Sequence, residues 1–314
     1  MSDVPGFTLV QLRYFVAAAE TGSMTAAAER LVIAQSAVSA AVSNLEKELR
    51  IQLFIRRRAR GLTLTPAGER LLQQARDLLN HVNEVTEEAR GSGRELSGPV
   101  SLGCFVTLAP LYLPPLLTAV ADTHPEIEVR VLEGETGEIA TALLGGRIDF
   151  ALAYDLGFDD EEILRETVAS APAHVIVSRE HRLAGRGSVD LAELANDPLI
   201  LLDLPHSREY FWSVLTSAGL NPVIRYRVRS YETVRSLVAQ GHGFALLNQV
   251  PLTAQTYSGG DVVALAIRGM SRPLDIVLAR LSGVRQTARA GAILGIARKA
   301  VAQTAAGHRI GAAR

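Results

Sequence analysis

Residues 23–48 contain two short amphipathic segments separated by a break, and this pattern limits the possible fold more than any other stretch. Apolar residues recur at helical spacing on both sides of Val32 and Ile33, so we predict two short helices that meet at a sharp turn. Small alanines give the first helix a thin side on which the second helix can cross closely. The pattern is typical of a helix-turn-helix. Its apolar positions are Ala26, Ala27, Leu31, Val38, Val42 and Leu45.

Short polar side chains occupy the outer, amino-terminal half of the second predicted helix. They can donate and accept hydrogen bonds and suit the base edges of a DNA major groove. Many polar helix faces are merely solvated, so this pattern alone leaves both interpretations open. Ser23, just before the first helix, either caps that helix or faces a phosphate. The polar positions of the second helix are Gln35, Ser36, Ser39, Ser43 and Asn44.

A third helix is predicted before this pair. Thr8 is suited to cap a helix that ends near Thr21 and Gly22 and carries apolar residues on one face. This helix would brace the other two. Ala34 stands where a serine or threonine would cap the second helix of the pair, which weakens the start of that helix by roughly 1 kcal/mol.

Residues 51–64 predict two short extended segments around a loop rich in arginine. Residues 1–66 hold eight basic and five acidic residues, a net charge of +3, although the whole chain carries a formal charge of −1. A basic hairpin beside a helix-turn-helix is placed to grip phosphates or a minor groove. A solvated basic loop is the alternative. The clustered arginines are Arg56, Arg57, Arg58 and Arg60.

A long helix is predicted from Thr65 and Pro66, with the threonine as its cap and the proline at its first position. Its apolar residues recur at alternating spacings of four and three, which forms a heptad stripe. About 25 residues of helix projecting from a small domain cannot bury such a stripe alone. We predict dimerisation through it, with packing on the chain's own C-terminal part as the alternative. The stripe includes Leu71, Ala75, Leu78, Val82 and Val85.

Beyond the Gly91-Ser92-Gly93 linker, strands and helices alternate. The β-α-β-α-β order over residues 100–153 predicts a parallel sheet with right-handed crossovers. A second set follows from 174 to 248, and residues 274–281 and 285–303 add a final strand and helix, with a frayed end after them. We therefore predict two α/β lobes joined by crossings near residues 170 and 271.

Polar groups follow the carboxyl ends of several predicted strands, where open α/β sheets bind ligands and where helix amino termini point. Hydroxyl groups and backbone N–H groups with little opposing negative charge suit a small anion. Each residue also has an ordinary role as a helix cap. We expect the effector-binding residues to be Cys104, Thr107, Thr136, Leu204, His206, Ser207 and Asn248.

Several other classes of protein are disfavoured. Cys104 is the single cysteine, so an internal disulfide is impossible and a small core residue is the simplest interpretation. No metal-ligand spacing, phosphate loop or nucleophile motif is found, so we expect no metal site, no cofactor and no catalytic residues. The longest apolar run is interrupted by prolines, and the N-terminus lacks a signal pattern, so a cytosolic location is expected.

Residues 12–72 together with DTHPEIEV, GGRIDFALA and VRSLVAQGHGFALL closely resemble the LysR-type transcriptional regulators. The resemblance implies a winged helix-turn-helix, a dimerising linker helix and a periplasmic-binding-protein-like effector domain of two lobes. It also implies DNA and a small effector as partners, and commonly a homotetramer. The predicted boundaries are 1–65 for the DNA-binding domain, 66–91 for the linker helix, 92–98 for a hinge, 99–170 with 272–314 for one lobe and 171–271 for the other.

The resemblance places the family's DNA-contacting helix positions on Gln35, Ser36, Ser39 and Ser43, and its wing contacts on residues 56–58. Its effector pocket falls on Thr107, Thr136 and the His206-Ser207 turn. Ala40 and Ala41 stand where relatives often carry Arg and Gln, and Arg50 replaces a common glycine. With fewer long side chains on this helix, wing contacts and DNA shape would carry more of the specificity.

Two other functions are weighed against a regulator. A transport protein with the same two-lobed fold would carry a secretion signal and would lack the basic helix pair. An enzyme would need a catalytic constellation in the cleft between the lobes, and the sequence contains none that we recognise.

Overall fold

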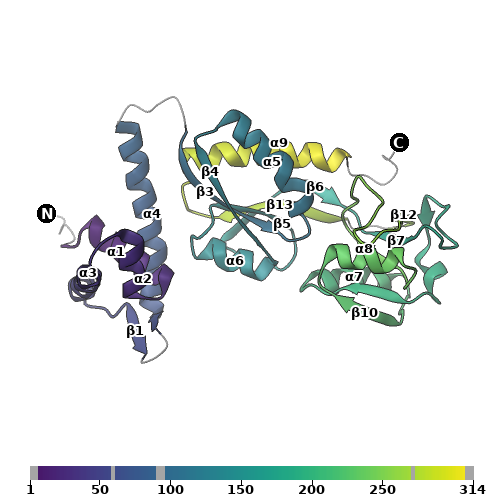
Figure 1. Ribbon diagram of the computed structural model, residues 1–314, viewed down its shortest axis with the longest axis horizontal. Helices are drawn as coiled ribbons and strands as arrows, with labels where there is room; N and C mark the ends of the chain where they lie inside the picture. The colour runs from purple at the N-terminus through teal and green to yellow at the C-terminus, as the bar shows by residue number, and fades with distance from the viewer. Residues whose placement is uncertain (1–5, 58–60, 90–95, 270–272, 308–314) are drawn as a thin grey trace. The chain divides into compact units, whose positions relative to one another are not determined.

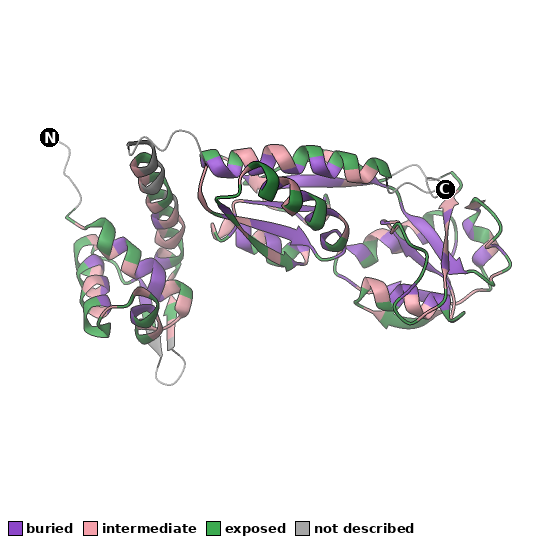
Figure 2. Cartoon of the chain, turned by 45° about the horizontal axis from the view of Figure 1, so that its top comes forward, coloured by how far each residue is buried: buried purple, intermediate pink, exposed green. Residues whose placement is uncertain are grey.

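The structure of the chain is a computed structural model that describes residues 6–57, 61–89, 96–269 and 273–307 (Figure 1). The chain forms two compact units, an N-terminal one of residues 1–95 with 144–147 and 284–287, and a C-terminal one of the other residues. The central strands of the C-terminal unit are largely buried, whereas the helices of both units are buried along one side and exposed along the other (Figure 2). Each unit therefore has its own hydrophobic core.

The N-terminal unit is a winged helix-turn-helix followed by a long helix, as predicted. The wing is an antiparallel hairpin in which Phe54 pairs with Leu64 and Arg57 with Gly61. Its elements are α1 (Leu9–Thr21), α2 (Met24–Leu31), α3 (Gln35–Leu49), β1 (Phe54–Arg57), β2 (Gly61–Leu64) and α4 (Pro66–Ala89).

The predicted helix caps are confirmed. The Thr8 hydroxyl accepts a hydrogen bond from the Gln11 N–H while the Gln11 side chain accepts one from the Thr8 N–H, which forms a capping box. Ser23 caps α2, and Gly22 ends α1 with φ 63°. Ala34 makes no side-chain cap for α3, as expected. The hydroxyl groups of Thr8 and Ser23 thus satisfy N–H groups that α1 and α2 leave unpaired.

Two residues with side chains adopt the left-handed conformation at helix ends. Val32 follows α2 with φ 56°, and Arg50 follows α3 with φ 54°. Glycine is the residue that tolerates this region best, so a side chain at either position carries backbone strain. Val32 is the more strained of the two, because its Cβ is branched and 89% of the residue is exposed, so packing does not compensate.

The core of the N-terminal unit joins all its elements. Phe15 of α1 meets Phe54 of the wing with ring centroids 5.5 Å apart. Glu20 of α1 binds Arg30 of α2 at 2.6 Å and Arg76 of α4 at 3.0 Å. Gly68 lets the start of α4 approach closely, since a Cβ there would lie 2.2 Å from the Leu53 carbonyl oxygen. The long helix is therefore an integral part of this unit.

The first lobe of the C-terminal unit is a five-stranded sheet in the order β4-β3-β5-β13-β6. The predicted parallel arrangement is confirmed for β4, β3 and β5, but β13 pairs antiparallel with β5 and β6, so the sheet is mixed. Helices α5 and α9 cover one face and α6 lies on the other (Figure 1). Its elements are β3 (Gly98–Phe105), α5 (Ala109–Thr123), β4 (Ile127–Gly134), α6 (Thr136–Leu144), β5 (Phe150–Tyr154), β6 (Ile163–Ala171), β13 (Leu274–Leu281) and α9 (Ala288–Gly307).

The second lobe contains a four-stranded sheet in the order β11-β7-β12-β8 and a parallel pair of β9 and β10. A bridge between Leu199 and Phe244 links the pair to the rest. Its elements are β7 (His174–Ser178), β8 (Ser188–Val189), η1 (Leu191–Leu194), β9 (Leu199–Leu202), α7 (Ser207–Ser217), β10 (Ile224–Val228), α8 (Tyr231–Ala239), β11 (Ala245–Leu247) and β12 (Val262–Ile267).

Several details differ from the sequence-based expectations. The strands β6, β8 and β12 and the short helix η1 were not predicted, because their alternating or short patterns resemble loops. Helix α9 begins at Ala288 rather than at 285 and extends to Gly307. The frayed end expected after it falls at 308–314, outside the residues that the structure describes. The predicted fold class, with two α/β lobes after the winged unit, is confirmed.

The chain crosses between the lobes twice, close to the predicted places. The first crossing leads from Ala171 at the end of β6 to His174 at the start of β7. The second leads from Ile267 at the end of β12 towards Leu274, and 270–272 lie outside the described residues. These crossings bring the ends of both sheets together at one place.

Candidate functional site

Helix α3 presents a polar, exposed face that its own core does not need. Val38, Val42 and Leu45 are 0 to 1% exposed and hold the inner face of α3 in the N-terminal core. On the outer face Gln35 and Ser36 are exposed, whereas Ser39 and Ser43 are half-buried. An exposed amino-terminal half of a second helix is the geometry by which helix-turn-helix proteins enter a major groove.

Ser23 has a structural role that the sequence left open. Its hydroxyl accepts a hydrogen bond of 3.4 Å from the Ala26 N–H at the start of α2. The residue is half-buried. This bond is long for its type, and a hydroxyl group keeps a donor and a further lone pair for a second partner such as a phosphate.

The wing is attached to α3 and to the glycine that ends α1. The Glu46 carboxylate of α3 accepts hydrogen bonds from the N–H groups of Leu53 at 2.7 Å and Phe54 at 3.2 Å. The Leu62 N–H donates to the carbonyl of Gly22 at 2.9 Å. Arg56 and Arg57 lie in β1, while Arg58 and Arg60 lie outside the described residues. The hairpin is thus held beside α3, with Arg56 and Arg57 as the last two residues of its first strand.

The apolar stripe of α4 serves two different purposes along its length. Ala75 is 2% exposed and belongs to the N-terminal core, and Leu71, Leu72 and Leu79 pack against that core. Leu78 and Val85 are 41% and 51% exposed, and Val82 is half-buried. The first turns of the stripe are therefore covered within the chain. The part that offers apolar surface to another helix is Leu78, Val82 and Val85.

In the C-terminal unit, Thr107 and Thr136 follow the carboxyl ends of neighbouring parallel strands. Phe105 of β3 pairs with Gly134 of β4, and the Val106 N–H donates to the Gly134 carbonyl at 3.1 Å. The two threonines, which follow at equal distances along the chain, therefore lie at the same edge. Both are buried, and the Thr136 hydroxyl has no hydrogen-bond partner among the described residues. A buried hydroxyl without a partner carries a cost that a bound ligand or water would remove.

A buried chain of polar groups lies beside this edge and joins the two lobes. The Tyr112 hydroxyl donates to the Gln249 side-chain oxygen at 3.2 Å, and the Gln249 amide donates to the Tyr154 hydroxyl at 3.1 Å. The Tyr154 phenol also interacts with the Thr107 side chain. Burial raises the pKa of Tyr112 to about 12, partly opposed by its bond to Gln249, and burial raises the pKa of Tyr154 further. Both phenols are neutral at physiological pH.

The turn after β9 comes close to the first lobe through a glycine. His206 precedes α7 with φ 61°, and Ser207 is 6% exposed. A Cβ on Gly157, in the loop after β5, would lie 2.5 Å from an imidazole carbon of His206. Gly157 also has φ 71°, a conformation that favours glycine. The His206 turn thus reaches the end of β5, where Tyr154 stands, and the structure brings Thr107, Thr136 and this turn to one region of the unit.

Three other predicted effector residues, Cys104, Leu204 and Asn248, have contacts or burial that give them a structural role. Cys104 is 0% exposed inside β3, and burial followed by the nearby Glu133 charge raises its pKa well above the ordinary value. Leu204 is 2% exposed and packs in the second lobe. The Asn248 side chain donates to the Ala171 carbonyl at 2.8 Å across the first crossing. Cys104 and Leu204 act as core residues, and Asn248 lies at the crossings.

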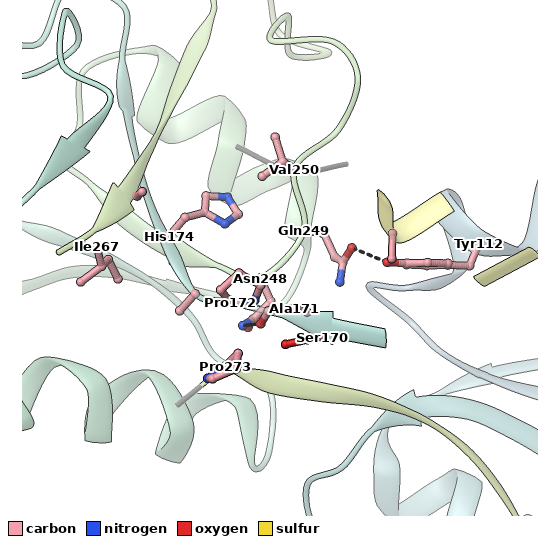
Figure 3. Close-up of a pocket in the computed structure, with 13 residues that line it drawn as sticks. Tyr112, Ser170, Ala171, Pro172, His174, Asn248, Gln249, Val250, Ile267 and Pro273 are labelled. Carbon is pink, nitrogen blue, oxygen red and sulfur yellow. Dashed lines mark hydrogen bonds between the residues drawn. The ribbon is translucent and has the colours of Figure 1, made fainter. Parts of the chain in front are cut away.

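A cavity of about 520 Å³ lies at these crossings. Its wall includes Tyr112, Gln249, Asn248, His174 and Ile267. Figure 3 shows the hydrogen bond between Tyr112 and Gln249 at one end of this group, with the imidazole of His174 and then Ile267 further along. Asn248 is the one predicted effector residue in this wall.

Sequence reasoning did not single out the buried polar residues Tyr112, Tyr154, Gln249 and His174. The sequence did contain a sign of them, because His174 and Tyr154 each stand in an otherwise apolar segment, AHVIV and FALAY. A polar residue that a strand buries among apolar ones needs a partner. The partner was not visible, because Gln249 lies 137 residues from Tyr112 in the sequence.

Neither a metal site nor a membrane span is evident where the structure is described. Within 6–57, 61–89, 96–269 and 273–307, no three His, Cys, Asp or Glu residues are grouped to hold a metal ion. Over the same ranges, no helix has the length and apolar character needed to cross a bilayer.

The sequence matches two protein families that together span nearly the whole chain. Residues 9–69 match the bacterial regulatory helix-turn-helix proteins of the lysR family, and residues 93–302 match the LysR substrate binding domain. The winged helix-turn-helix and the two α/β lobes are the folds of these two parts. The chain belongs to the LysR family of transcriptional regulators.

Individual relatives agree with this assignment. The solved structure of HinK, a LysR family transcriptional regulator from Pseudomonas aeruginosa, has 35% sequence identity and a TM-score of 0.62, covering 95% of this chain and 99% of that one. A probable hydrogen peroxide-inducible genes activator from Streptomyces viridosporus is 31% identical over 90% of both chains. A peroxide-bound cysteine-to-serine mutant of OxyR from Corynebacterium glutamicum has 28% identity and a TM-score of 0.60, covering 98% of this chain and 95% of that one.

The general function follows from the family and the fold together. The protein is a LysR-family DNA-binding transcriptional regulator with a C-terminal effector-binding domain, as the sequence predicted. The family is one of transcription regulators.

Proposed function

We propose that this chain acts in the cytoplasm as a dimer of dimers on promoter DNA, and that a small organic anion bound in its C-terminal unit modulates that binding. The observation that carries the effector part is the buried, unpartnered hydroxyl of Thr136 at the start of α6, beside Thr107. The proposed division is 1–65 for DNA binding, 66–91 for the linker helix, 92–98 for the hinge, and lobes of 99–170 with 272–314 and of 171–271.

DNA is bound, in this proposal, by the outer face of α3 and by the wing. Gln35 and Ser36 are exposed, and Ser39 and Ser43 are accessible in part, so these four are assigned to the major groove. Ser23 and residues 56–58 are assigned to phosphates. The polar residues of α3 are short, so shape and phosphate contacts carry a large part of the affinity.

Replacing Arg56, Arg57 and Arg58 with alanine tests the assignment of the wing. Each lost phosphate contact makes the slope of log affinity against log salt concentration shallower by about one. The slope of the triple variant should therefore be shallower by about 2 to 3, and the variant should bind all DNA sequences more weakly. Fluorescence anisotropy with labelled duplexes at several salt concentrations measures this slope. The matched control replaces three exposed arginines of the C-terminal unit, Arg179, Arg225 and Arg268. Equal slopes for both triples would contradict the wing assignment.

Dimerisation is assigned to Leu78, Val82 and Val85 of α4. Leu71 and Ala75 support the same helix from the inside, because they pack against the N-terminal core of their own chain. Replacing Leu78 and Val85 with lysine should yield monomers in light scattering, since it places charges in an apolar seam. Lysines at Gln73 and Asn80, on the opposite side of the helix, should leave the dimer intact. A monomeric wild-type protein would refute the assignment.

The effector edge suits an anion for three reasons. The Thr136 hydroxyl can donate a hydrogen bond into the edge, and the amino end of α6 adds N–H groups and a partial positive charge. Glu135 is paired with Arg229 of the second lobe, so its charge is compensated, and the Glu138 carboxylate in the first turn of α6 accepts a hydrogen bond from the Glu135 N–H at 3.0 Å. His206 and Ser207 add polar groups from the second lobe. This pairing between lobes also gives the ligand a means of changing their closure.

A thermal-shift screen of small carboxylates tests the effector site. A ligand that raises the melting temperature of the wild type should raise that of Thr136→Val and Thr107→Val by less than half as much, because the valine removes a hydroxyl partner and keeps the shape. Thr141→Val is the matched control, since the exposed Thr141 of the same helix bonds only to the Gly137 carbonyl among the described residues. Undiminished stabilisation of both variants would place the ligand elsewhere.

Sensing of peroxide through a thiol, which the names of several relatives suggest, is not part of this proposal. Cys104 is the only cysteine of the chain, and it is fully buried. Its raised pKa leaves little of the thiolate that reacts with peroxide. The effector site is therefore assigned to binding rather than to oxidation.

A further inference from the structure

We propose that the cavity at the lobe crossings is a second ligand site, which takes a small, uncharged and mainly apolar molecule that donates or accepts a hydrogen bond at His174. This site is separate from the effector edge at Thr107 and Thr136. It rests on its own observations, namely the shape of the cavity, the composition of its wall and the state of the His174 ring.

The first observation is the state of His174. The residue is 1% exposed, and neither ring nitrogen has a hydrogen-bond partner among the described residues. A neutral imidazole carries one donor and one acceptor, so two hydrogen-bonding groups are buried and unsatisfied. Such groups cost free energy unless a ligand or water meets them. The ring forms part of the wall of a cavity large enough to hold one.

The second observation is the space beside the ring. His174 is the first residue of β7 and pairs with Ala266 of β12 on one side and with Leu247 of β11 on the other. Side chains of directly paired residues lie on the same face of a sheet, so on the side of Ala266, which lines the cavity, the ring stands next to a single methyl group. Ala266, Ala171 and Ala305 all line the cavity with small side chains. The cavity of about 520 Å³ falls in the size range of small-molecule sites.

The third observation is the absence of fixed charge. Among the described residues that line the cavity there is no Asp, Glu, Lys or Arg, and His174 is the single titratable imidazole. Burial lowers the pKa of His174 to about 4. The Pro172 backbone raises this pKa by a smaller amount, although neither ring nitrogen makes a hydrogen bond among the described residues. A carboxylate would find no cation here. The site therefore favours neutral ligands, in contrast to the effector edge.

The cavity is connected to the effector edge by the buried polar chain. Tyr112 lines the cavity, bonds to Gln249, and Gln249 bonds to Tyr154, which in turn interacts with Thr107. The crossings that border the cavity, at Ala171 to His174 and at Pro273, are also the segments about which the lobes would move. A ligand that fills this space would therefore favour one arrangement of the lobes.

Three neutral probes, phenol, benzamide and 2-naphthamide, test the site against the anion 2-naphthoate. The nitrogen shifts of the His174 ring, read in a long-range ¹H-¹⁵N spectrum of the whole protein, report a hydrogen bond at either nitrogen. We expect saturable shifts with at least one neutral probe and at least tenfold weaker binding of 2-naphthoate. Ligands that act only at the effector edge would leave these nitrogen shifts unchanged and would remain sensitive to Thr136→Val.

Two variants distinguish a binding site from an internal water. Ala305→Leu fills the cavity from a half-buried position at the end of α9 and should weaken probe binding at least tenfold; the exposed Ala306→Leu is its control. His174→Phe keeps the ring and should also weaken binding about tenfold, with Ala305→Leu as the test if this variant fails to fold. Affinities that are unchanged in Ala305→Leu, or no shift with any neutral probe, would overturn the proposal.

Discussion

The two units satisfy their polar groups in different ways. In the N-terminal unit Thr8 and Ser23 bond within three residues of themselves, and Gln35 and Ser36 of α3 are exposed. In the C-terminal unit the decisive polar groups are buried, and Gln249 meets partners 95 and 137 residues away in the chain. A surface that contacts DNA can rely on local structure, whereas a site that excludes water has to be assembled from distant segments.

The same contrast separates the two candidate ligand sites of the C-terminal unit. At Thr136 a hydroxyl without a partner lies at a helix amino terminus beside a compensated carboxylate. At His174 a neutral ring without partners lies in a wall that, over the described residues, has no fixed charge. Similar defects in hydrogen bonding thus favour different ligands, because the surrounding charges differ.

The largest expected effect concerns a close contact in the N-terminal unit. Gly68→Ala should reduce the free energy of unfolding of this unit by about 3 kcal/mol or more, because the new Cβ would lie 2.2 Å from the Leu53 carbonyl oxygen. Gly291→Ala is the matched change in α9, where a Cβ meets nothing within 4 Å. It should raise stability by about 0.5 to 1 kcal/mol, as alanine does in an open helix position. Urea denaturation of both variants measures the difference, and equal effects would refute it.

The next effect compares distant with local hydrogen bonds. Gln249→Leu leaves the buried phenols of Tyr112 and Tyr154 without this partner and should cost about 2 to 3 kcal/mol. Gln11→Ala removes one side of the exposed capping box at Thr8 and should cost about 1 kcal/mol or less. Denaturant melts that resolve the two units measure both. A smaller cost for Gln249→Leu than for Gln11→Ala would contradict the contrast between the units.

A third effect depends on pH and belongs to His174. Its pKa is about 4 in the folded protein and near 6.5 in an unfolded chain, because burial disfavours the charged ring. Between these values the unfolded chain holds a proton that the folded chain lacks, so stability falls as the pH falls from 6.5 towards 4. From pH 7.5 to 5 this loss should be about 2 kcal/mol.

The variant His174→Phe isolates that loss. Denaturant melts at pH 7.5 and 5 give the free energy of unfolding of the wild type and of the variant. The loss between the two pH values should be about 2 kcal/mol smaller in the variant, since other titrating groups are common to both. An identical pH dependence would show that His174 is charged or solvated in the folded protein.

The smallest effect lies at an exposed helix end of the N-terminal unit. Val32→Gly should raise the melting temperature, with a gain of about 1 kcal/mol, because Val32 has φ 56° and 89% exposure and so has strain without compensating packing. Calorimetry measures the change. Val223→Gly is a control at another exposed valine, which is not among the residues with positive φ in the described structure, and it should not stabilise the protein.

The sequence by itself determined the helices, their caps and most strands. Thr8, Ser23 and Ala34 predicted the three helix starts correctly, since caps depend on residues within one turn. The strands β6 and β12 were missed because their pairing partners are distant and their patterns are weak. The five-stranded sheet proved mixed because β13 returns from the end of the chain to pair with β5.

Only the tertiary structure decided which polar residues meet. It brings Thr107, Thr136 and the His206 turn to one region of the C-terminal unit. It also shows that Asn248 lies at the crossings and that Ala75 is covered within its own chain. Composition and periodicity report the face on which a residue lies. They do not report the partner that a buried group finds, because that partner comes from another part of the chain and is chosen by packing.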